Sequence, residues 1–131
     1  ATLKLNKIND NLSIDSNNKK IKIKSVMVDH GNVKSSCFII DKKLAYISDV
    51  SNINNNDFRY FKKLDYFIVD CLWYKHHPSH FNLEKSLYFI NKFKPKKAIL
   101  TNLSPVLDYK ELRKMLPTNV FPAHDGLTVN L

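Results

Sequence analysis

The segment Tyr66-Phe67-Ile68-Val69-Asp70 decides the fold class, because it is a short run of mostly apolar residues. The run ends in an acid. Such a run is typical of a strand that is buried on both faces. A second run of this kind, Ala98-Ile99-Leu100-Thr101, follows later in the chain. Between the two, Asn82 and the apolar spacing of residues 83–93 predict a capped helix, which Lys94-Pro95 ends. This order of strand, helix and strand predicts an α/β protein.

The chain before this segment is predicted to be mostly β. Polar and apolar residues alternate through residues 21–28, as in a strand with one wet face. Two apolar runs, 36–40 and 44–48, flank a turn at Asp41-Lys42-Lys43 and predict a hairpin buried on both faces. A short helix is expected from Asp57 through Leu64.

The chain after this segment adds one helix and two short strands. Asp108 is placed to cap a helix that Pro117 ends. Val120-Phe121 and residues 127–129 are expected to pair around Asp125-Gly126. With no repeat or internal linker, we expect residues 1–131 to form a single domain.

Composition indicates a globular chain with an excess of lysine. The 131 residues are 44% hydrophobic and carry a formal charge of +9. Arg59 and Arg113 are the only arginines, and the lysines occur in dispersed pairs. Because base readers and bidentate phosphate clamps favour arginine, we interpret the excess mainly as coding bias and do not expect nucleic acid as a partner. A basic module that binds nucleic acid or another anion stays open as an alternative.

The cysteines and the hydropathy pattern indicate the cell compartment. Cys37 and Cys71 lie inside apolar runs rather than at metal or redox spacings, which predicts two buried free thiols. No apolar run is long enough to span a bilayer, and no signal peptide opens the chain. We therefore expect a cytoplasmic protein with no membrane partner.

Polar residues with useful chemistry follow several of the predicted strands. His30, Asp49, Asp70 and Asn102 each come at or just after the end of an apolar run, and His80 lies in the loop after Asp70. Ligand sites in α/β folds gather at the carboxyl ends of strands. Imidazole and carboxylate groups suit zinc or manganese. A lone histidine after a strand is more often a surface or hydrogen-bonding residue, and Asp49 and Asp70 could equally cap loops, so the prediction depends on all of them converging.

Several segments resemble, in order, the second half of metallo-β-lactamase-fold hydrolases, in the branch of the phosphoribosyl cyclic phosphate phosphodiesterase. These segments are residues 28–31, 44–50, 65–70, 77–83, 97–104, 107–109 and 123–127. The resemblance implies the carboxyl-terminal half of an αββα sandwich, a mixed sheet with helices on its outer face. It also implies metal-dependent, phosphodiesterase-like hydrolysis with two divalent ions, zinc or manganese.

The resemblance assigns roles residue by residue. His30 matches a metal-ligand histidine, and Asp49 matches the aspartate that bridges the two metals. His80 matches a catalytic histidine that acts in acid–base chemistry or stabilises the attacked phosphate. Asn102 stands where the family has its last ligand histidine, and Pro105 replaces a second histidine in that motif. An asparagine amide is a weaker ligand than imidazole for these metals.

The family's His-x-His-x-Asp-His motif does not occur in this sequence, whose first histidine is His30. We therefore expect a truncated hydrolase that is inactive alone and binds metal weakly. A separate chain carrying the amino-terminal half, or self-association, would complete it, and its substrate would be a small phosphodiester. The alternative is a remnant of a split gene that has lost catalysis.

Overall fold

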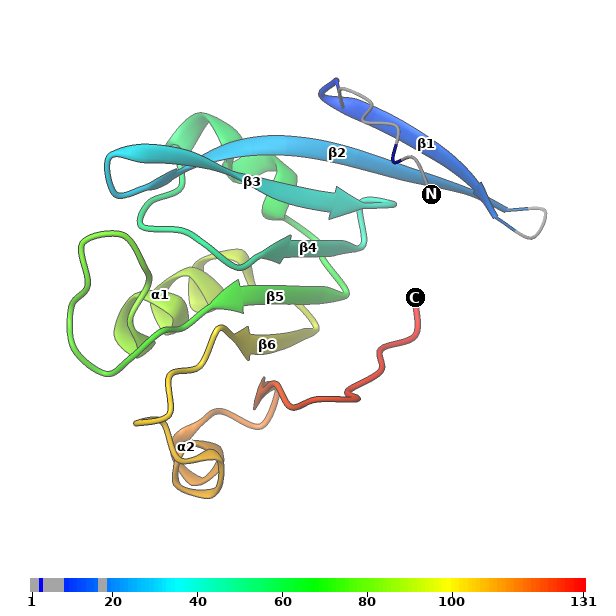
Figure 1. Ribbon diagram of the computed structural model, residues 1–131. Coiled ribbons are helices and arrows are strands. Elements are labelled where there is room, and N and C mark those ends of the chain that lie inside the picture. The colour runs from blue at the N-terminus through cyan, green and yellow to red at the C-terminus, as the bar shows by residue number, and fades with distance from the viewer. Residues whose placement is uncertain (1–2, 4–8, 17–18) are drawn as a thin grey trace.

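The computed structural model describes residues 3, 9–16 and 19–131, and it contains one mixed sheet of seven strands in chain order (Figure 1). The strands are β1 (Asn11–Ser16), β2 (Lys19–His30), β3 (Val33–Ile40), β4 (Leu44–Ile47), β5 (Tyr66–Asp70), β6 (Lys97–Thr101) and β7 (Val120–Pro122). The helices are the 3₁₀ helix η1 (Asn55–Phe61), α1 (Leu83–Phe93) and α2 (Tyr109–Met115). The predicted α/β class is confirmed.

The sheet changes from antiparallel to parallel at β4. Neighbours from β1 to β4 pair antiparallel, whereas those from β4 to β7 pair parallel. Short turns can join only antiparallel strands, and parallel neighbours need a longer crossover. Here η1, α1 and α2 lie in those crossovers. As a result the carboxyl ends of β4, β5 and β6 share one edge of the sheet, where the candidate residues follow.

One face of the sheet packs against η1 and α1, which lie behind the sheet in Figure 1. Phe67 on β5 contacts Phe61 of η1 and Phe93 of α1, with ring centroids 5.8 and 5.7 Å apart. The rings of Phe61 and Phe93 stack at 5.0 Å. All three side chains are buried. Because each buried phenylalanine contributes about 1.5–3 kcal/mol, this cluster fixes the helices on the sheet.

The opposite face carries an apolar row across five strands. The register pairs Phe38 with Tyr46, Tyr46 with Ile68, Ile68 with Ile99 and Ile99 with Phe121. Tyr46 is 39% exposed, so the expected two-sided burial of the β3–β4 hairpin is wrong on this face. We call these five residues the open-face row.

Two sequence predictions need correction. Val120 and Phe121 do not pair with residues 127–129: β7 pairs parallel with β6, and residues 127–129 form no strand. The crossover through α2 lets β7 reach the free edge of β6 and pair with it in parallel. The predicted hairpin would have left that edge of β6 unpaired. The helix expected from Asp57 is a 3₁₀ helix over Asn55–Phe61, which Asn54 caps.

The other local predictions are close to the structure. Asn82 caps α1 by accepting a hydrogen bond from the Lys85 amide at 3.0 Å, and Lys94 ends the helix in a left-handed conformation. Cys37 and Cys71 are both buried and unpaired, as expected. Among the described residues, no helix is both long and apolar enough to cross a bilayer.

Candidate metal centre

Three candidate residues meet at the carboxyl edge of the sheet. His30 ends β2, Asp49 follows β4, and His80 lies in the loop between β5 and α1. Their potential ligand atoms all lie within 4.8 Å of one another. Asp70 and Asn102 lie directly beside them. The structure therefore brings the residues that follow the strands and the loop residue His80 together at one edge of the sheet.

His30 is held in one orientation by the loop before α1. Its Nδ1 lies 2.7 Å from the Ser79 carbonyl oxygen. Because a carbonyl only accepts, Nδ1 must carry the proton, which leaves the lone pair of Nε2 free. The close approach of Ser79 depends on Gly31, which adopts φ +60° and where a Cβ would lie 3.0 Å from the Ser79 Cβ. This pattern of bonding is typical of a metal-binding histidine.

His80 is oriented in the same way by a carboxylate. Its Nδ1 lies 2.9 Å from Asp70 Oδ2 and 3.9 Å from Asp49 Oδ1. Donation from Nδ1 to the Asp70 carboxylate leaves Nε2 as the unprotonated nitrogen. The rings of His30 and His80 meet edge to face with centroids 4.6 Å apart. In the neutral form of each histidine, Nε2 is therefore the nitrogen that carries the lone pair.

Asp70 is the hub of this network. Its side chain is fully buried. Oδ2 accepts a hydrogen bond from His80, and it also accepts from the backbone amides of Val50 at 3.2 Å and Phe81 at 3.3 Å. Oδ1 accepts a hydrogen bond from Asn102. Burial raises the pKa of the Asp70 carboxyl, and the bonds from Asn102, Val50 and His80 act in the opposite direction. Asp70 thus fixes His80 and the start of the loop after β4.

Asn102 acts as a donor in this arrangement. Its Nδ2 lies 3.1 Å from Asp70 Oδ1, 3.3 Å from the Ser48 carbonyl oxygen and 3.2 Å from His80 Nδ1. The two amide protons satisfy the first two acceptors, since His80 Nδ1 is itself a donor to Asp70. Asn102 adopts φ +59°, a conformation that asparagine tolerates better than most residues. The residue therefore braces Asp70 instead of presenting a nitrogen lone pair.

The donor set of His30, Asp49 and His80 fits a divalent transition metal. Two imidazole nitrogens and one carboxylate are suitable ligands for zinc or manganese. Ligand atoms around tetrahedral zinc lie about 3.4 Å apart, given bonds of about 2.0–2.2 Å. In this structure the potential ligand atoms lie within 4.8 Å of one another. To bind one ion, they would have to come closer to one another by about an ångström. Side-chain rotation of Asp49, which is 47% exposed, can provide that movement.

Sequence reasoning noticed Asp70 but gave it no role. The available signal was an acid at the end of an otherwise apolar strand, where burial demands several hydrogen bonds. His77, in the same loop as His80, accepts a hydrogen bond from the Ser79 amide at 3.3 Å, and its ring centroid lies 5.2 Å from that of His80.

Solved structures identify the architecture that holds this centre. A diphosphatase of the PhnP family matches 98% of this chain with 27% identity and a TM-score of 0.88. The metallo-β-lactamase-fold protein YhfI from Bacillus subtilis matches 92% with 17% identity and a TM-score of 0.71. The chain has the fold of about half of a metallo-β-lactamase-fold protein. Within that fold, it resembles the PhnP-like branch.

The chain spans about half the length of these solved proteins, 49% of the diphosphatase and 53% of YhfI. Human tRNase Z, short form, shows the same fold over 92% of this chain and 46% of its own, with 14% identity and a TM-score of 0.66. No protein-family model and no curated protein sequence matches the chain.

Proposed function

We propose that this chain supplies one half of a metal-dependent hydrolase centre of the phosphodiesterase type. His30 and Asp49 are the metal ligands, and His80 is the acid–base group. The observation that carries the proposal is the way in which hydrogen bonds orient both histidines. Each places Nδ1 against a protein oxygen, and one nitrogen of each ring lies within 4.8 Å of an Asp49 oxygen.

The residues divide the chemistry among them. A bound zinc or manganese ion would supply Lewis-acid activation at His30 and Asp49. The two oxygens of the Asp49 carboxylate allow it to hold one ion or to bridge two. His80 can accept or deliver a proton through Nε2, because its Nδ1 proton bond to Asp70 stabilises the imidazolium form that arises. Asn102 keeps Asp70 in place for that task.

The remaining ligands would come from polypeptide that carries the His-x-His-x-Asp-His motif. The open-face row is the surface on which we propose that this polypeptide packs, as a second sheet. The row lies opposite the face covered by η1 and α1, and the solved PhnP-family diphosphatase contains about as much chain again as this half. Such a layer would desolvate the exposed Tyr46 of this row, whereas Ile99 is already buried.

Metal titration tests this proposal directly. We expect isothermal titration of the parent chain with zinc to show weak binding of one ion. His30→Ala and Asp49→Ala should each weaken it by at least tenfold, because each removes a ligand. His124→Ala is the matched control, since His124 is exposed and lies outside the cluster. Hydrolysis of bis(p-nitrophenyl) phosphate by the chain alone should stay at background.

The replacement at Asn102 favours one competing function, a half-fold that has lost catalysis. That alternative predicts no zinc binding beyond that of the His30→Ala and Asp49→Ala variants. Equal affinity in the parent and in both variants would therefore replace the hydrolase proposal with this one. Two tightly bound ions per chain would contradict both.

A further inference from the structure

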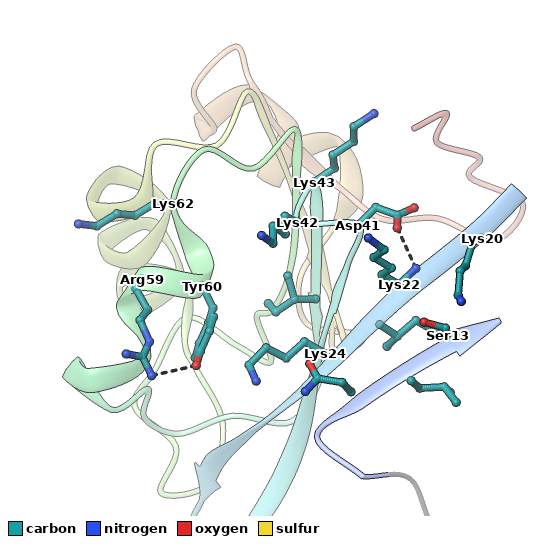
Figure 2. Close-up of a pocket in the computed structure, with 14 residues that line it drawn as sticks. Ser13, Lys20, Lys22, Lys24, Asp41, Lys42, Lys43, Arg59, Tyr60 and Lys62 are labelled. Carbon is teal, nitrogen blue, oxygen red and sulfur yellow. Dashed lines mark hydrogen bonds between the residues drawn. The ribbon is translucent and has the colours of Figure 1, made fainter.

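The fold gathers lysines that are dispersed in the sequence around one concave pocket of about 890 Å³. Seven cationic side chains line it, with Asp41 as its one carboxylate: Lys20, Lys22, Lys24, Lys42, Lys43, Arg59 and Lys62. Figure 2 shows them projecting from β2, from the β3–β4 turn and from the η1 segment. We call this surface the basic pocket.

The basic pocket is separate from the candidate metal centre. Lys22 lies near the start of β2, whereas His30 ends the same strand. At about 3.3 Å per residue along a strand, the two positions are about 26 Å apart. The pocket also lies on the face that carries η1, because Lys24 packs over the Tyr60 ring with Nζ 4.8 Å from its centroid. Ligand binding here therefore does not depend on the metal centre.

The basic pocket keeps a net positive charge, although Asp65 lies near Lys43. Asp41 Oδ1 accepts a hydrogen bond from the Lys22 backbone amide at 2.8 Å and, as the one carboxylate of the pocket, offsets one of the seven positive charges. Within the described residues, none of the seven cations forms an ion pair, although Lys34, Lys96 and Lys114 do so elsewhere. An array of like charges raises the local potential and attracts an anion.

The backbone that carries Lys22, Lys42 and Lys43 is held in place. The Asp41 amide donates to the Lys22 carbonyl at 2.8 Å, which joins the turn to β2 through two hydrogen bonds. Asp41 and Lys42 both have positive φ, 49° and 57°, as in the tight turns that join hairpin strands. The turn therefore presents Lys42 and Lys43 beside Lys22 on a fixed frame.

We propose that the basic pocket binds a nucleic-acid strand through its phosphate groups. The cations are nearly all lysines, which act as point charges toward phosphate and carry little base specificity. The one aromatic ring, Tyr60, has Lys24 and Arg59 each 4.8 Å from its centroid. It is thereby engaged by cations and does not stack on bases. Binding is consequently independent of sequence and dominated by counterion release.

The test uses a fluorescein-labelled 20-nucleotide single strand of mixed sequence, titrated with the full chain in EDTA. With four to six phosphate contacts and a slope of about −0.7 per contact for single strands, affinity should fall about 50- to 340-fold between 50 and 200 mM salt. A second strand of unrelated sequence should bind equally. Absence of binding at 50 mM salt, or a flat salt response, would overturn the proposal.

Matched charge reversals locate the binding. Lys22→Glu with Lys43→Glu should weaken binding by at least 20-fold, while Lys110→Glu with Lys114→Glu on α2 should change it less than threefold at the same net charge. Equal losses in the two variants would contradict a defined pocket. Circular dichroism verifies that both variants fold, and the salt response of the parent remains a test if one does not.

Competitors separate phosphate from other polyanions. Unlabelled single-stranded RNA should displace the probe, which supports recognition of the phosphate backbone. Polyglutamate that competes as well as RNA would show that the pocket takes acidic protein instead, and inorganic polyphosphate that competes 100-fold better per phosphate would show that a nucleic-acid strand is not its ligand.

Discussion

Replacing Asp70 tests whether one buried carboxylate holds the sheet edge together. Asp70→Ala would leave the buried amides of Val50 and Phe81 without an acceptor. Each unpaired buried donor costs about 1–3 kcal/mol, which gives about 2–6 kcal/mol for the two amides. His80 and Asn102 can turn toward water and add less. We therefore expect a loss of about 3–4 kcal/mol in the free energy of unfolding.

Two further variants sharpen this expectation. In Asp70→Asn, the amide oxygen can keep the three donors on the Oδ2 side, and the amino group then faces that of Asn102. The loss should fall to about 1–2 kcal/mol, one broken hydrogen bond with its charge assistance. Asp49→Asn is the control, because this half-exposed side chain accepts no backbone amide and should change stability by about 0.5 kcal/mol or less.

Urea unfolding followed by Trp73 fluorescence provides the measurement. With a slope of about 2 kcal/mol per molar urea, Asp70→Ala should lower the midpoint by about 1.5–2 M. The midpoint of Asp70→Asn should lie between that of Asp70→Ala and that of the parent. A midpoint for Asp70→Ala within 0.3 M (roughly the control's shift) of that of Asp49→Asn would refute the reasoning.

Three other predictions concern the thiols, the two sheet faces and the replaced ligand. Burial raises the pKa of Cys71 to about 12 and that of Cys37 further, so neither thiol should react with iodoacetamide at pH 8 until urea unfolds the chain; mass spectrometry would show the adducts. Phe67→Ala should cost about 3–5 kcal/mol because Phe67 is fully buried, whereas Tyr46→Ala on the open face should cost less than half as much in the same urea assay. Asn102→His should restore an imidazole at the sheet edge and raise zinc affinity at least tenfold by calorimetry, while Asn102→Gln should not; equal affinities would show that this position lies outside the metal centre.

Local sequence signals predicted much of the fold because they act over a few residues. Asn82 and Lys94 mark the ends of α1, and the apolar run ending at Asp70 marks β5, in close agreement with the structure. The pairing partner of Val120 was missed, because a short strand carries little information about which edge it joins. That choice depends on the crossover length and on the free edge of β6.

The candidate site could be predicted in part. Strand-end placement was enough to bring His30, Asp49 and His80 together, since it follows from the topology. The bracing by Asp70 and Asn102 depends on side-chain hydrogen bonds between residues distant in sequence, which no local pattern encodes. The basic pocket was missed for the same reason: its lysines come from separate segments that only the folded sheet brings together.

The most direct test of the metal centre is anomalous diffraction from crystals of the parent chain grown with zinc and collected at the zinc edge. The proposed function predicts one anomalous peak at the sheet edge, bound by His30 Nε2 and an Asp49 oxygen at about 2.0–2.2 Å, with His80 Nε2 facing it. Crystals that show His30 and Asp49 clearly with no peak between them, or with zinc only at His76 and His77, would contradict it.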